Sequence, residues 1–85
     1  MRVTVIPEDG FVSVDGEGYS GLDLSFIPQE VHALQWYTDE GEIEYQDARG
    51  RATHNEAITA LSQFEYWGQC YAAWQAAKTA ALPET

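Results

Sequence analysis

The amino-acid sequence predicts an α+β fold, in which a small antiparallel β-meander of about four to five short strands packs against one long C-terminal α-helix. The first half of the chain supports the meander, because short segments of alternating apolar and polar residues are separated by glycine-containing turns. The last third supports the helix, because its aromatic residues recur every three to four positions. With 85 residues, the chain is expected to form a single domain over 1–85, with the meander in 1–52 and the helix in 53–82.

Three short strands are expected near the N-terminus. Residues 2–6 and residues 11–14 alternate apolar and polar side chains. Between them, residues 7–10 (Pro-Glu-Asp-Gly) have turn composition, because proline fixes the first corner and glycine relaxes the last. Residues 15–16 (Asp-Gly) predict a tight two-residue hairpin turn, which needs positive φ angles. Residues 17–19 are then the return strand.

The middle of the chain predicts another extended segment and then the clearest hairpin. Residues 20–26 alternate, and Pro28 ends this segment because the residue before a proline prefers an extended backbone. Residues 31–37 and 42–46 are the two strands of the hairpin. Gly41, in the connecting loop, is expected to take the left-handed conformation.

The side chains of this hairpin divide between two faces. His32, Leu34 and Trp36 share one face of the first strand. Ile43 and Tyr45 share one face of the second. We expect the apolar members of this set to form the inner face of the sheet, while the alternating glutamates face water.

The final segment predicts a helix that packs on this inner face. After a polar connector over 47–52, residues 53–56 (Thr-His-Asn-Glu) match a capping box. Helix-favouring residues continue to Leu82, and Pro83 marks the end. The aromatic residues expected to pack in the core are Trp36, Tyr45, Phe64, Trp67, Tyr71 and Trp74.

The expected length of the helix poses a packing problem. The helix would be roughly 42 Å long, whereas a compact domain of this size is roughly 30 Å across. One solution is a kink at Gly68, since glycine costs about 1 kcal/mol in a helix interior. The other is that the alanine-rich end, residues 72–81, projects and contacts a partner or a second copy, so a homodimer through this end stays open.

The charge of the chain limits its function. Fourteen acidic residues against four basic residues give a formal net charge of −10. Direct binding to nucleic acid or to an anionic membrane is therefore not expected, whereas a basic protein partner is favoured. Cys70, the single cysteine, can form no intramolecular disulfide. The sequence predicts no secretory signal and no membrane span, which fits a cytoplasmic location.

No group of residues predicts catalysis, a cofactor or a metal site. His32 and His54 have no nucleophile at the spacing of known catalytic sets. Residues 15–23 place oxygen ligands near glycines, but Phe26 stands where a calcium-binding loop needs a glutamate. We therefore expect no enzymatic activity, no cofactor and no metal.

Carboxylates gather around the predicted hairpin, where the alternation predicts exposure to water. Such a patch is a solvated surface, and it is also the candidate for docking a basic partner or for mimicking the phosphate charge of DNA. The residues of this acidic patch are Asp39, Glu40, Glu42 and Glu44.

Residues 7–16, 21–24, 33–36, 41–45 and 55–56 form a set of turn, inner-face and cap motifs that covers nearly the whole chain. In these motifs the chain resembles small proteins of tailed bacteriophages and prophages, which are often encoded near tail-fibre genes. The resemblance implies a phage or prophage origin, and a location in the cytoplasm of the bacterial host or in the virion. It also implies a role near tail or tail-fibre assembly, and it implies no catalytic residues.

Two functions follow from the charge and the resemblance. The first is a non-enzymatic binding or assembly factor for tail or tail-fibre proteins. The alternative is an acidic inhibitor or DNA mimic that acts on a nucleic-acid-binding protein of the host.

Overall fold

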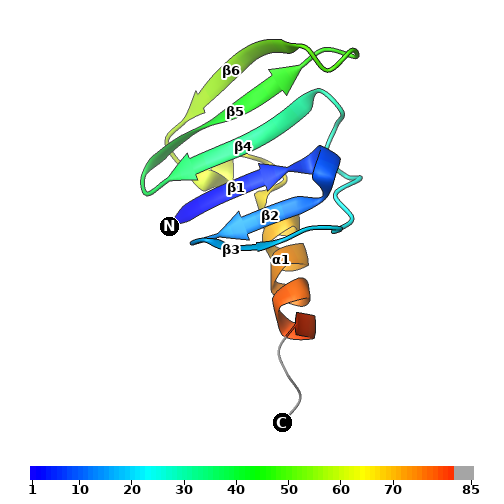
Figure 1. Cartoon of the computed structure of the whole chain (residues 1–85). Helices are drawn as coiled ribbons and strands as arrows, with labels where there is room; N and C mark the ends of the chain where they lie inside the picture. Colours follow the sequence, from blue (N-terminus) through cyan, green and yellow to red (C-terminus); the bar gives the residue numbers. More distant parts are fainter. Residues whose placement is uncertain (82–85) are drawn as a thin grey trace.

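The computed structural model describes residues 1–81, which form a six-stranded antiparallel sheet and one α-helix (Figure 1). The strand order is β3-β2-β1-β4-β5-β6. This is the α+β architecture that the sequence predicts, with more strands than expected. The elements are β1 (Arg2–Ile6), η1 (Pro7–Asp9), β2 (Phe11–Val14), β3 (Glu17–Tyr19), β4 (Val31–Tyr37), β5 (Glu40–Gln46), β6 (Ala52–Ile58), η2 (Leu61–Gln63) and α1 (Trp67–Ala81).

One face of the sheet, the inner face, carries the hydrophobic core. In β1, Val3 and Val5 are at most 1% exposed. Their cross-strand partners in β4 are Trp36 and Leu34, and Leu34 pairs in turn with Ile43 of β5. Burial of large side chains at every second position is the reason that these segments form strands.

The two tight hairpin turns differ in which residues take the left-handed conformation. Between β2 and β3, Asp15 and Gly16 have φ angles of 52° and 85°, as the predicted two-residue turn requires. Between β4 and β5, the left-handed residue is Thr38, with φ of 53°. The prediction for Gly41 is wrong, because Gly41 lies within β5 opposite Trp36. A Cβ at Gly41 would lie 2.3 Å from a backbone oxygen of β4, so glycine is needed there for close approach.

The segment between β3 and β4 is a loop, not the extended strand-like segment predicted over 20–26. The amide of Leu22 donates a 2.9 Å hydrogen bond to the carbonyl oxygen of Gly10. Leu24 and Ile27 then join the core, with 4% and 6% exposure. The apolar spacing of this segment therefore reflects burial without strand pairing.

The largest difference from the prediction lies in the segment 53–82. Ala52–Ile58 form β6, which pairs antiparallel with β5, and α1 begins only at Trp67. The capping-box pattern at 53–56 does not start a helix. Thr, His and Asn have weak helix propensity, and pairing with β5 provides partners for their backbone groups. The predicted helix end at Leu82 lies outside the described residues.

A short turn connects β6 to α1. The Oε1 atom of Gln63 accepts hydrogen bonds from the amides of Thr59 (2.6 Å) and Ala60 (3.0 Å). Gly68 lies in the first turn of α1, and the helix continues without interruption to Ala81, so Gly68 does not kink it. The described helix is therefore about 22 Å long, which removes most of the expected length problem.

The helix packs on β2 and β3, not on the β4–β5 hairpin as predicted (Figure 1). Trp74 is 6% exposed, and its Nε1 donates a 2.7 Å hydrogen bond to the carbonyl oxygen of Glu17 in β3. Its ring meets Tyr19 edge-on, at 6.3 Å between centroids. Lys78 Nζ lies 5.0 Å from the centre of the Trp74 ring and 3.6 Å from a carboxylate oxygen of Glu17. These contacts hold α1 at the β3 end of the sheet.

The segment just before α1 covers the hairpin in place of the helix. Phe64, which precedes α1, borders the same small cavity as Ile43 and Tyr45. Of the aromatic residues expected in the core, Trp36, Phe64 and Trp74 are buried, and Tyr45, Trp67 and Tyr71 are partly buried against the core.

Candidate functional site

The outer face of the sheet, opposite the core, carries mainly polar side chains. Thr4 of β1 and Gln35 of β4 hydrogen-bond across this face, with 3.1 Å between their side-chain oxygens. The helix lies on the other face of the sheet (Figure 1). A polar face without a packed helix can receive another molecule.

The sequence-predicted acidic patch lies on and beside this outer face. Glu40, Glu42 and Glu44 occupy alternate positions of β5, which puts them in one row at steps of roughly 6.8 Å. Glu40 and Glu42 are exposed, Glu44 is half-buried, and Asp39 is exposed in the adjoining turn. We call Glu40, Glu42 and Glu44 the acidic row.

Within residues 1–81, none of the three glutamates of the acidic row forms an ion pair. Their cross-strand partners on β4 and β6 are uncharged residues. In this described part of the chain, the one ion pair joins Lys78 and Glu17 at the opposite end of the sheet. The row is therefore a concentration of unpaired negative charge on an open surface.

Tyr37 extends the outer face beside the acidic row, and sequence reasoning did not single it out. It pairs with Arg2 on one side and with Glu40 on the other, and it is 48% exposed. The Arg2 guanidinium lies 5.2 Å from the centre of the Tyr37 ring. The available signal was the alternation itself, which places Tyr37 on the face opposite Trp36.

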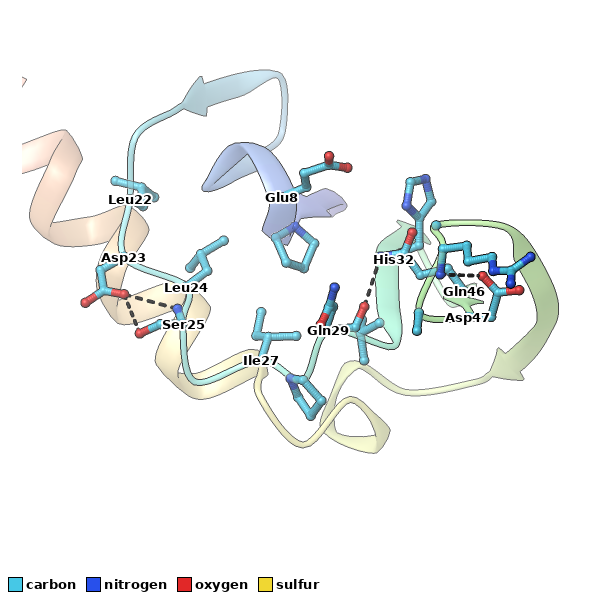
Figure 2. A pocket seen from close by; sticks show the side chains of 16 residues that line it. Glu8, Leu22, Asp23, Leu24, Ser25, Ile27, Gln29, His32, Gln46 and Asp47 are labelled. Atoms are coloured by element: carbon cyan, nitrogen blue, oxygen red, sulfur yellow. Dashed lines mark hydrogen bonds between the residues drawn. The ribbon is translucent and has the colours of Figure 1, made fainter.

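A separate cleft of about 680 Å³ lies between the 22–29 loop, the start of β4 and the β5–β6 turn (Figure 2). Asp47 organises that turn, because its Oδ1 accepts hydrogen bonds from the amides of Arg49 (2.9 Å) and Arg51 (3.0 Å). Gln46 Nε2 donates a 2.9 Å hydrogen bond to the carbonyl oxygen of Gln29, which links the turn to the loop. The cleft is therefore bordered by linked segments, and its lining mixes polar side chains with apolar ones such as Leu24 and Ile27.

A β-bulge places His32 in this cleft. Val31 pairs with Tyr45 and Ala33 pairs with Glu44, so His32 has no cross-strand partner. Val31 takes the core position, and the prediction that His32 lies on the inner face is wrong because the bulge reverses the alternation. The His32 Nδ1 atom is buried without a hydrogen-bond partner. It thus lacks the orienting hydrogen bond that catalytic histidines use.

The second histidine, His54, lies on a different element. It is exposed on β6, and its ring stacks on Tyr45 with 4.6 Å between centroids. Its Nδ1 is 3.2 Å from the hydroxyl of Thr53. Its described contacts are thus a stacked ring and a neighbouring hydroxyl.

Three shifted pKa values reflect local structure. Hydrogen bonds from the Ser25 hydroxyl (2.6 Å) and amide (3.1 Å) lower the pKa of Asp23. Burial raises the pKa of Cys70 to about 12, which keeps the thiol protonated and unreactive at neutral pH. Burial, and then the hydrogen bond to Glu56 (3.0 Å), raise the pKa of Tyr45.

Among residues 1–81, no three or more histidine, cysteine or acidic side chains are grouped so that they could hold a metal ion. Over the same residues, no helix has the length and apolar character needed to span a membrane. Comparisons of the chain with protein families, with curated proteins and with solved structures found no match.

Proposed function

We propose that this chain is a non-enzymatic binding protein that docks a basic surface of a partner protein on the outer face of its sheet. The observation that carries the proposal is the acidic row, Glu40, Glu42 and Glu44, which has no cationic neighbour on the adjoining strands. Complementary charge accelerates encounter and selects partners of opposite sign. The net charge of −10 adds to this preference.

The resemblance to tailed-phage proteins suggests the partner. In that setting, the protein is a binding or assembly factor of a phage or prophage, and its partner is a tail or tail-fibre protein. It would act in the cytoplasm of the bacterial host or remain in the virion. The proposed contact uses the side chains of the acidic row and needs no cofactor.

The test is binding to a tail-fibre protein of a tailed phage, the partner class that the resemblance suggests. The variant Glu40→Gln/Glu42→Gln/Glu44→Gln removes the charge of the row and keeps its shape. We expect a loss of affinity between about threefold and about 150-fold at low salt, since exposed charge pairs contribute roughly 0.2–1 kcal/mol each and the variant removes three of them. The remaining binding should also depend less on salt.

A matched control removes the same number of charges elsewhere. The variant Glu8→Gln/Asp9→Asn/Glu30→Gln changes three exposed carboxylates outside β5. It should bind the partner nearly as well as the wild type does. Equal losses of affinity in both variants would show that only net charge matters. An affinity that changes neither in the two variants nor with salt concentration would contradict the proposal.

A second function has one specific observation in its favour, the regular spacing of the acidic row on an open sheet. Evenly spaced carboxylates can replace phosphates in the site of a nucleic-acid-binding protein. In this alternative the chain inhibits such a protein of the host. The test is competition: the wild type should displace double-stranded DNA from the host protein, and the triple glutamine variant should not.

A further inference from the structure

A groove of about 310 Å³ lies beside the acidic row at the turn end of the outer face. It is formed by the end of β4, the start of β5 and the end of β6. Ala57 contributes only a methyl group to it, and Gly41 contributes only backbone. Among the residues that line it are Tyr37, Glu40, Gly41, Glu42, Ala57 and Thr59.

The chemistry of this groove fits one kind of side chain. The Tyr37 ring is 48% exposed and offers a face to a cation. Glu40 and Glu42 line the same groove and supply carboxylates for a planar, bidentate donor. The small side chain of Ala57 leaves room in the groove for an aliphatic stem. Arginine combines all three requirements, because its guanidinium stacks on aromatic rings and forms paired hydrogen bonds with carboxylates.

The chain already holds one guanidinium against this ring. Arg2 lies 5.2 Å from the centre of the Tyr37 ring and belongs to β1. The lining of the groove comes from β4, β5 and the end of β6, on the other side of Tyr37. The ring is therefore accessible to a guanidinium, and the groove side is still free within the described residues.

We propose that this groove is the anchor for an arginine side chain of the basic partner. This inference rests on the proposed function, because it names the group that the acidic face recognises. Glu40 and Glu42 belong to the anchor, whereas Glu44 belongs to the same row but does not line the groove. The row thus attracts the partner, and the groove selects arginine.

The direct test uses three short peptides, acetyl-Gly-Arg-Gly-amide and its lysine and citrulline analogues. Each is titrated into the isotopically labelled protein, and amide and ring shifts are followed by NMR. The arginine peptide should cause saturable shifts at Tyr37, residues 40–42 and residues 57–59. The lysine peptide should bind several-fold more weakly, and citrulline, which has the same shape without charge, should cause none. Equal shifts with arginine and citrulline would overturn the proposal.

Variants separate the anchor from general charge attraction. Tyr37→Leu should weaken binding of the arginine peptide about two- to fivefold, as expected for an exposed cation–π contact, while Tyr37→Phe should bind normally. Glu42→Gln should weaken binding more than Glu44→Gln, which makes the same charge change outside the groove. Arg2→Gln should strengthen it by removing a competing cation. Equal effects of the two glutamine variants would contradict the anchor.

The two proposals fail in different ways. If the arginine peptide does not bind but the triple glutamine variant still binds the partner protein more weakly than the wild type, the proposed arginine anchor is wrong and the proposed acidic docking face is retained. If the peptide binds at the groove but the affinity for the partner protein does not change in the triple glutamine variant, the proposed function is wrong and the proposed arginine site is retained.

Discussion

The two ends of the sheet are built differently. At the β3 end, α1 covers the inner face, and Trp74 joins the helix to the sheet through the carbonyl oxygen of Glu17. At the β6 end, the strand Ala52–Ile58 has six exposed residues, and only Ile58 is buried. The helix-covered end thus carries more of the packing, while the β6 end and the outer face remain available for contacts.

We expect this difference to separate the residues that determine stability from those that are available for binding. Burial of large apolar side chains dominates folding free energy, so the β1–β4 centre and the Trp74 contact should determine whether the domain folds. Exposed polar positions contribute little to stability and can change with little penalty.

Trp74→Ala should have the largest effect. It removes a buried indole and leaves a cavity between α1 and β3, and Trp→Ala changes of this kind cost about 3–5 kcal/mol. The free energy of unfolding should be measured by urea denaturation. Trp74→Phe, which keeps an aromatic ring but loses the Nε1 donor, should cost less and remain folded.

The matched position at the other end is His54. His54→Ala removes a ring that stacks on Tyr45 at the exposed strand, and it should change the free energy of unfolding by no more than about 0.5 kcal/mol. Comparable losses for Trp74→Ala and His54→Ala would contradict the division between a helix-covered end and an exposed end.

The same division explains which parts of the fold the sequence could predict. The strands 2–6, 11–14 and 31–37 have the predicted bounds, because one face of each is buried and alternation records that burial. The strand 17–19 also has the predicted bounds, but it was predicted from the turn before it, and none of its residues is buried. β6 was missed because nearly all its side chains are exposed, so its sequence carries no alternation of apolar and polar residues. Because β6 forms through its pairing with β5, its own residues do not show the pattern from which a strand can be predicted.

Gly41→Ala should destabilise the pairing of β4 with β5. The added Cβ would lie 2.3 Å from the carbonyl oxygen of Gln35 and 2.9 Å from the Cα of Trp36, and neither backbone atom can move away easily. Overpacking of this kind costs about 1–3 kcal/mol, to be measured by urea denaturation.

Gly68→Ala is the control for this change. A Cβ at Gly68 meets no atom within 4 Å, and the residue lies in α1. Alanine should therefore leave stability unchanged or raise it by up to about 1 kcal/mol. If both glycine variants behaved alike, the close approach at Gly41 would not be the reason for glycine there.

Thr38→Gly should stabilise the β4–β5 turn. A β-branched residue in the left-handed region costs about 1–2 kcal/mol, and glycine relieves that strain at some cost in chain entropy. The net gain should be up to about 1 kcal/mol, seen as a higher melting temperature. A lower melting temperature would show that Thr38 makes a contact that outweighs the strain.

The candidate site was predicted only in part. Alternation correctly placed Glu42 and Glu44 on the face opposite the core, because register fixes the face of each residue. Tyr37 was missed because an aromatic residue at the end of an apolar strand resembles a core residue in sequence. The inner-face assignment of His32 failed because a β-bulge depends on pairing with β5, which the residues of β4 do not encode alone.

The smallest expected effect concerns Tyr45 at the β6 end. Its pKa is raised by burial and then by the hydrogen bond to Glu56, so the folded state favours the neutral phenol. This contribution to stability is fully present below pH 10, the ordinary pKa, and is lost as the pH rises through the higher folded value. The difference in absorbance at 295 nm between the wild type and Tyr45→Phe should report this titration. Glu56→Gln should move it partly back toward the ordinary value, because burial remains while the carboxylate is gone. If the pKa of Tyr45 did not change in Glu56→Gln, burial alone would account for its raised value.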